Sequence, residues 1–125
     1  MIQKLTPILR VEKIEPHLDF WVDRLGFTKV IEMKEGEELG FVILTLGHIE
    51  VMLQTRASLA KDIPALAKGD FCATVLYLGI TDLEEIEKKL LGIEVVVPKR
   101  QTTYGANEIW VRAPGGHVIG FAAAS

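Results

Sequence analysis

Cysteine and aromatic residues are scarce in this sequence. The 125 residues include one cysteine, Cys72, and Phe, Trp and Tyr together make up 7% of the chain. A single cysteine excludes an internal disulfide as a source of stability. Because Cys72 lies in the apolar run FCATVLYL, we expect a buried thiol rather than a nucleophile.

The sequence also lacks an excess of basic charge and any long apolar run. Its net charge of −3 gives no electrostatic footprint for nucleic acid. Its apolar runs all fall short of the roughly 18 residues that a membrane-spanning helix needs. The first residues do not have the pattern of a signal peptide. We therefore expect a cytoplasmic protein that binds neither nucleic acid nor a membrane.

Apolar residues are abundant, at 49% of the chain, which is enough to form a core. Their alternation is clearest in the last hairpin, residues 107–122, whose turn contains a Gly-Gly pair able to adopt positive φ angles. One face of this hairpin is apolar. The opposite face carries Glu108, Trp110 and Arg112, and Gly120 leaves a gap in it.

The same order of elements occurs twice along the chain. The first half predicts strand 5–11, a helix that starts at Glu15-Pro16 and ends at Gly26, and strands 27–34, 39–46 and 49–54. The second half predicts strand 72–80, a helix from the capping box Asp82/Glu85 to Gly92, strand 93–97, a polar loop 98–106 and the final hairpin. In the first helix, the spacing of Leu18, Trp21, Val22 and Leu25 predicts one buried stripe, which leaves His17 on the solvated side.

This repeat predicts an α+β fold made of two β-α-β-β-β modules. We expect module 1 at about residues 1–55, a linker at about 56–70 and module 2 at about 71–125, all within one domain. Each helix covers one face of its own sheet. The other faces are left uncovered, so the two curled mixed sheets are predicted to surround a cleft.

Four segments in this order carry a family resemblance: HLDFWVDRLGF, HIEVML, LYLGITDLEEIEKKL and YGANEIWVRAPGGHVIGF. Together they resemble the vicinal oxygen chelate superfamily, which includes glyoxalases, bleomycin resistance proteins and extradiol dioxygenases. In the last segment, Ala113 replaces the first Asp of the Asp-Pro-Asp-Gly type of turn found in the family. The resemblance implies the fold described above and a homodimer.

In metal-dependent members of this superfamily, four side chains meet in the cleft, two from each module. The resemblance places the matching positions at Thr6, Glu50, Val75 and Gly120. Only Glu50 is a strong ligand, and a divalent first-row ion needs about three or four protein ligands. We therefore expect no metal and no other cofactor, and with them no metal-assisted lyase, isomerase or dioxygenase chemistry.

Strand alternation predicts which side chains face the cleft. The expected inward set is Thr6, Ile8, Arg10, Phe41, Ile43, Thr45, Glu50, Met52, Gln54, Val75, Tyr77, Trp110, Arg112 and Gly120. Such a mostly apolar lining with a few polar groups is typical of a small-molecule site. The candidate ligand-binding residues are Arg10, Phe41, Glu50, Met52, Gln54, Tyr77, Trp110 and Arg112.

The roles of two of these residues stay open at this point. Glu50 is predicted either to have a raised pKa through desolvation, as a catalytic base would, or to pair with Arg10 or Arg112. Trp110 is predicted either to stack on a planar or cationic ligand or to pack at a subunit interface.

Three functions follow, and the first is preferred. It is a metal-free protein, without catalysis, that sequesters a small organic ligand, aromatic or cationic, in the cleft of a homodimer. The second is a glyoxalase-like enzyme, a lyase, isomerase or dioxygenase that uses Glu50 as a base or as part of a metal site. The third is a non-catalytic dimer whose cleft is filled by its own side chains.

Overall fold

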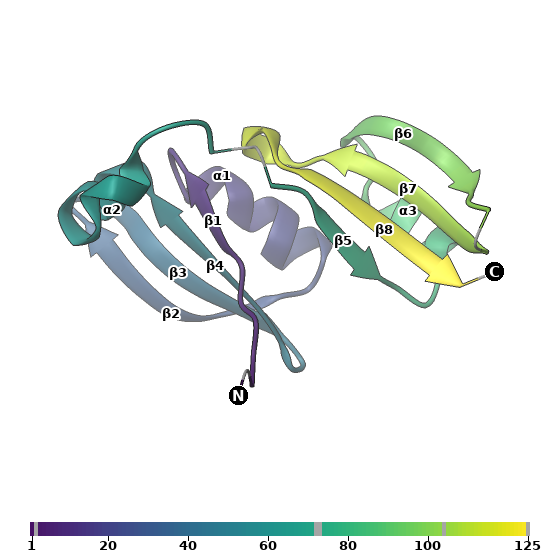
Figure 1. Ribbon diagram of the computed structural model, residues 1–125, viewed down its shortest axis with the longest axis horizontal. Coiled ribbons are helices and arrows are strands. Elements are labelled where there is room, and N and C mark those ends of the chain that lie inside the picture. The colour runs from purple at the N-terminus through teal and green to yellow at the C-terminus, as the bar shows by residue number, and fades with distance from the viewer. Residues whose placement is uncertain (2, 72–73, 104, 125) are drawn as a thin grey trace. The chain divides into compact units, whose positions relative to one another are not determined.

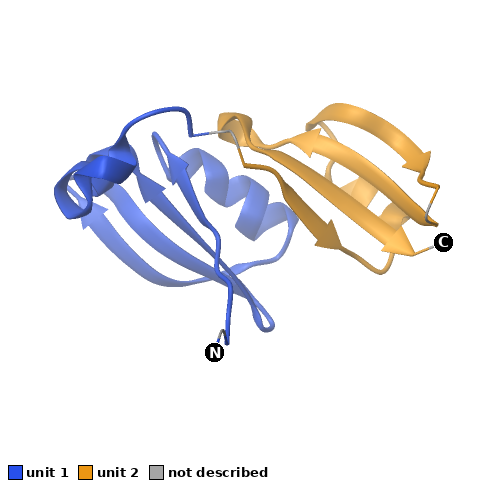
Figure 2. Cartoon of the chain, in the orientation of Figure 1, with its two compact units in different colours: residues 1–71 blue, residues 72–125 orange. Residues whose placement is uncertain are grey.

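Each half of the chain folds into a four-stranded mixed sheet accompanied by helices (Figure 1). The structure is a computed structural model that describes residues 1, 3–71, 74–103 and 105–124. The chain forms two compact units, residues 1–71 and 72–125 (Figure 2). The predicted linker, residues 56–70, therefore belongs to the first unit.

The first unit contains β1 (Ile8–Val11), α1 (Glu15–Leu18), a π-helical segment (Asp19–Arg24), β2 (Thr28–Glu35), β3 (Glu38–Leu46), β4 (Ile49–Thr55), α2 (Arg56–Asp62) and a 3₁₀ turn (Pro64–Ala67). The second contains β5 (Leu76–Gly79), α3 (Leu83–Lys89), β6 (Glu94–Gln101), β7 (Ala106–Arg112), a 3₁₀ turn (Pro114–Gly116) and β8 (Val118–Ala124). Among the helices of the described residues, none combines the length and the apolar character that a membrane-spanning helix requires.

Both sheets have the same topology, which confirms the predicted repeat. The strand order is β1-β4-β3-β2 in the first sheet and β5-β8-β7-β6 in the second. In each sheet the first strand of the unit pairs in parallel with the last, and the other pairs are antiparallel. This arrangement is the predicted α+β fold of two β-α-β-β-β modules.

Strand alternation in the first sheet separates a core face from an open face. The core face carries the buried residues Leu9, Val11, Val42, Leu44, Val51 and Leu53. On the open face, Phe41 lies opposite Gln54, Ile43 opposite Met52 and Thr45 opposite Glu50. The side chains of β1, β3 and β4 therefore point to the faces that strand alternation predicts.

The first helix differs from the expected regular α-helix. After α1, the chain widens into a π-helix, in which the N–H of Leu25 donates to the carbonyl of Phe20 at 3.1 Å, five residues back. The wider turn buries Phe20 together with Trp21, whose place in the core was predicted. The prediction that His17 is solvated is wrong, because its side chain is only 3% exposed.

Two boundaries in the second unit also differ from prediction. The polar segment 98–106 was expected to be a loop, but β6 continues to Gln101. The strand can include Pro98 because it lies at the edge of the sheet and its pairing with β7 is irregular there. The strand expected at 72–80 is limited to β5, and Cys72 lies outside the described residues. The hairpin turn is as predicted, with φ angles of 85° at Gly115 and 103° at Gly116.

The two faces of the first sheet should respond differently to truncation. We expect Leu53→Ala to lower the free energy of unfolding by about 2–5 kcal/mol, because Leu53 is fully buried. Its neighbour Met52 is half-buried on the open face, so Met52→Ala should cost less than about 1 kcal/mol. Urea denaturation of both variants measures the difference. Equal losses would contradict the assignment of faces.

Candidate functional site

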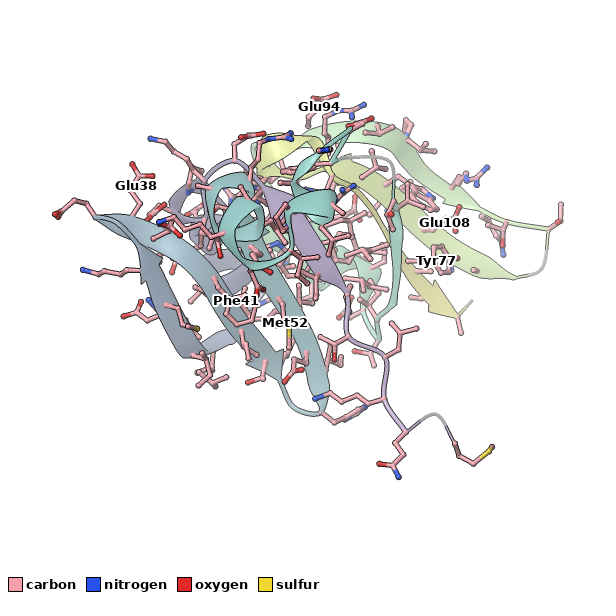
Figure 3. The ribbon with its side chains drawn as sticks, turned by 60° about the vertical axis from the view of Figure 1, so that its left-hand side comes forward. Glu38, Phe41, Met52, Tyr77, Glu94 and Glu108 are labelled. Atoms are coloured by element: carbon pink, nitrogen blue, oxygen red, sulfur yellow. The ribbon has the colours of Figure 1, made fainter. Side chains whose placement is uncertain are left out.

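The open face of the first sheet gathers the predicted residues of the first module. Arg10 and Phe41 each pair with Gln54, and Met52 pairs with Ile43. Ile31 and Met33 of β2 extend this apolar surface, and both are exposed. Phe41 and Met52 lie on neighbouring strands (Figure 3). Exposed apolar side chains in such a group are typical of a surface that binds a ligand or another protein.

A cavity of about 410 Å³ lies where this open face meets α2. Its lining residues are Met33, Lys34, Glu35, Phe41, Gln54, Ser58, Lys61 and Asp62. Gln54 donates to the hydroxyl of Ser58 at 3.0 Å, and Lys61 pairs with Glu35 at 2.6 Å. Four of the polar side chains that line this cavity therefore already bind one another.

Arg10 lies on the open face, but its guanidinium holds the chain segment that follows α2. It donates to the carbonyls of Leu66, Lys68 and Asp70 at 3.2, 3.3 and 2.9 Å. It also lies over the ring of Phe71, 4.7 Å from the centroid. These contacts give Arg10 a structural role, and its predicted contact with a ligand stays a prediction.

Glu50 has other partners than those predicted. Its carboxylate accepts a hydrogen bond from the Thr6 hydroxyl at 3.1 Å and pairs with Lys4 at 3.0 Å. Within the first unit Glu50 therefore pairs with Lys4 and not with Arg10, and a pairing with Arg112 of the second unit stays a prediction. The hydrogen bond from Lys4 is the largest influence on this group, and it lowers the pKa of Glu50 despite some desolvation. The expected rise in pKa is also wrong.

The donors at the chelating positions do not fit a divalent ion. In the first unit they are a hydroxyl and one carboxylate, and Lys4 already neutralises the carboxylate. In the second unit the register places Tyr77, rather than Val75, opposite Gly120. Among residues 1, 3–71, 74–103 and 105–124, no three His, Cys, Asp or Glu side chains are grouped as a metal site would require. The absence of a cofactor stays a prediction.

The open face of the second sheet carries an aromatic platform formed by Tyr77 and Trp110. The indole of Trp110 lies on Gly120 of the next strand, so that a Cβ atom at Gly120 would be 2.8 Å from three ring atoms. The Tyr77 ring is adjacent, with 5.5 Å between the centroids and 38° between the planes. The gap predicted at Gly120 is therefore filled by the protein's own indole.

A buried carboxylate, Glu108, fixes both rings of the platform. Glu108 is 1% exposed and lies beside Tyr77 (Figure 3). Its Oε2 accepts from the Tyr77 hydroxyl at 2.7 Å, and its Oε1 accepts from Trp110 Nε1 at 3.0 Å. Arg100 donates to Oε1 through Nε at 2.9 Å and through its terminal nitrogen Nη2 at 2.6 Å.

These donors stabilise the ionised form of Glu108. The hydrogen bond from Tyr77 is the largest influence, followed by that from Trp110, and together with Arg100 they lower the pKa of the carboxyl group against the effect of desolvation. Glu108 is therefore a charged, hydrogen-bond-accepting support for the platform.

Glu108 and Arg100 are absent from the candidates predicted from the sequence. Alternation in the last hairpin does place Glu108 on the face of Trp110, so this signal was available. Arg100 gave no such signal, because it lies in the segment expected to be a loop. The remaining predicted residue, Arg112, pairs with Glu94 at 3.3 Å and donates to the carbonyl of Gly116 at 3.4 Å.

No family model and no curated protein matches the sequence. Solved structures do match the fold. A glyoxalase/bleomycin resistance protein/dioxygenase from Nocardioides has a TM-score of 0.74 at 20% identity, over 99% of this chain and 85% of that one. A lactoylglutathione lyase from Agrobacterium tumefaciens has a TM-score of 0.75 at 14% identity, over 97% and 92% of the two chains.

A third solved structure is a bleomycin-binding protein from Streptomyces verticillus complexed with copper(II)-bleomycin. Its TM-score is 0.64 at 22% identity, and the match covers 100% of both chains. One of these proteins is named for binding and another for catalysis, so the likeness concerns the fold and not the activity. The chain thus has the fold of these glyoxalase/bleomycin resistance protein/dioxygenase structures, as its sequence predicts.

Proposed function

We propose that this protein binds a small organic molecule with a planar ring, without a metal and without catalysing its conversion. The observation that carries this proposal is the indole of Trp110, which lies on Gly120. One face of the indole is turned to the sheet and the side chain is half-buried, so we propose that the outer face receives the ligand. Stacking on that face, beside Tyr77, is how we expect the ring to bind.

The platform suits binding because its rings are held in place before a ligand arrives. A single carboxylate, that of Glu108, accepts hydrogen bonds from Tyr77 and Trp110. Rings that are already fixed lose little conformational entropy when a ligand stacks on them. Arg100 compensates the charge of Glu108, so we propose that the ring, rather than a cationic group, is what the platform recognises.

The enzymatic alternative has weaker support. Glu50 would be its base, but Lys4 lowers the pKa of Glu50, and a carboxylate with a low pKa is a weak base near neutral pH. The donors at the chelating positions do not supply a metal site either. Among the fold neighbours, the Streptomyces verticillus protein is named for binding bleomycin, which supports a binding role on this fold.

We also propose that the protein is a homodimer. The exposed apolar side chains on the open face of the first sheet support this, because a second copy would remove them from water. Sedimentation velocity of the purified protein measures the mass, and a monomer at all concentrations would contradict this part of the proposal.

Binding to the platform should depend on one of the two tryptophans. The probe is indole-3-carboxamide, a neutral planar bicycle, titrated into the protein by isothermal calorimetry. We expect Trp110→Ala to weaken binding about tenfold or more, because the stacking surface is lost. The control is Trp21→Phe, which alters a tryptophan in the core of the first unit and should keep the affinity. Unchanged affinity in Trp110→Ala would contradict the proposal.

The platform should also lose its order in acid. The pKa of Glu108 lies below its ordinary value of 4.5. The ionised carboxylate therefore stabilises the folded protein fully at pH values above 4.5. This stabilisation is lost as the pH falls through the lowered pKa. Tyr77→Phe removes the largest cause of the lowering, so the loss should begin at a higher pH.

The measurement is an acid titration of Trp110 fluorescence in a Trp21→Phe background, where Trp110 is the only tryptophan. We expect the midpoint in Tyr77→Phe to lie at a higher pH than in the parent. A midpoint that stays the same or falls would show that Tyr77 does not stabilise the Glu108 carboxylate.

A further inference from the structure

We propose that Arg100 binds an anionic group of the ligand beside the aromatic platform, so that the preferred ligand is a planar aromatic acid. This inference rests on the proposed function, because the ring of the same ligand lies on Trp110. It adds a specificity-determining residue and a chemical class of ligand to that function.

A local irregularity of β6 brings Arg100 to this face. Val97 pairs with Trp110, and Arg100 pairs with Glu108. Between these two pairs the chain covers three residues along β6 but only two along β7. The extra residue reverses the alternation of β6. Arg100 therefore points to the same face as Glu108 and Trp110, where regular pairing would have turned it to the opposite face.

Glu108 holds one edge of the guanidinium and leaves another edge outward. Nε and Nη2 of Arg100 both donate to Glu108 Oε1, while Nη1 donates to no other group among the described residues. The Arg100 side chain is 56% exposed, whereas the carboxylate that holds it is 1% exposed. An oriented and accessible guanidinium is well suited to binding a carboxylate through charge-assisted hydrogen bonds.

The same contacts place the guanidinium next to the ring surface. Glu108 Oε1 accepts from both Arg100 and Trp110, so the two donor groups are neighbours around one oxygen atom. A ligand whose carboxylate is attached directly to a flat ring system can then contact both. Aromatic stacking would hold its ring and Arg100 its carboxylate.

An anion fits this arrangement better than a cation does. A cationic ligand would have to displace Arg100 from Glu108, and Arg100 is held there by two short hydrogen bonds. An anion can add to the outer edge of Arg100 without breaking either bond. The two arginines predicted from the sequence to bind the ligand are engaged elsewhere, Arg10 with carbonyl groups and Arg112 with Glu94.

The test compares two probes with the same ring, indole-3-carboxylate and indole-3-carboxamide, by calorimetry at pH 7. In the wild-type protein we expect the carboxylate to bind about tenfold more tightly than the amide. Arg100→Gln should bring the ratio of the two affinities close to one. Because this ratio is measured on one variant, any loss of platform order in that variant affects both probes alike. Arg100→Lys keeps the charge but not the planar fork, and should retain part of the preference.

Arg24→Gln is the matched control, because it removes one positive charge from an arginine of the first unit that also pairs with a carboxylate, Asp19. It should leave the preference for the carboxylate unchanged. Raising the ionic strength should weaken binding of indole-3-carboxylate and spare indole-3-carboxamide, since only the former involves a charge pair with the protein.

The outcomes separate this inference from the proposed function. If both probes bind through Trp110 with equal affinity, or if Arg100→Gln leaves the preference intact, Arg100 does not bind the anion and the inference is overturned while ring binding stands. If neither probe binds, or binding is indifferent to Trp110→Ala, the proposed function itself fails. Because the preference is a ratio of two affinities measured on the same variant, a general weakening of the platform in Arg100→Gln does not change this reading.

Discussion

Four hydrogen-bond donors converge on the Glu108 carboxylate. These contacts hold Tyr77, Trp110 and Arg100 in place on the open face of the second sheet. A buried carboxylate is unfavourable unless its charge and its oxygen lone pairs are satisfied. Here the donors come from three strands: Tyr77 from β5, Arg100 from β6 and Trp110 from β7. The carboxylate thereby ties these strands together on the side of the sheet that α3 does not cover.

The two units use one topology to build two different surfaces. In the first sheet, Met52 of the last strand lies between Ile8 and Ile43, and these bulky side chains make the open face apolar. In the second sheet, Ala122 of the last strand lies between Gly79 and Glu108. Small residues on β5 and β8 leave room for rings and a carboxylate to lie on the sheet.

The sequence was informative wherever a side chain's direction follows from strand alternation. Phe41 and Met52 share a face because period-2 alternation continues through β3 and β4, and Trp110 meets Gly120 because a short hairpin fixes the register between β7 and β8. The repeated order of strands and helix also predicted that each half forms a mixed sheet from the same β-α-β-β-β sequence of elements.

Prediction failed where backbone geometry departs from its regular period or where partners come from distant segments. The π-helix buries Phe20, which regular spacing places away from the predicted stripe. His17 is buried because it lies four residues before Trp21, at the border of that stripe. The extra residue in β6 turns Arg100 to the open face. The partner of Glu50 is Lys4, which precedes the first strand, and no periodicity indicates such a contact.

The close approach of Trp110 to Gly120 decides which side chains this part of the sheet can carry. By resemblance, metal-dependent members of the superfamily carry a chelating side chain at the position of Gly120. In this protein any side chain there would begin 2.8 Å from the indole and would displace it. A chelating side chain at this position and a tryptophan that lies flat on the sheet are therefore mutually exclusive.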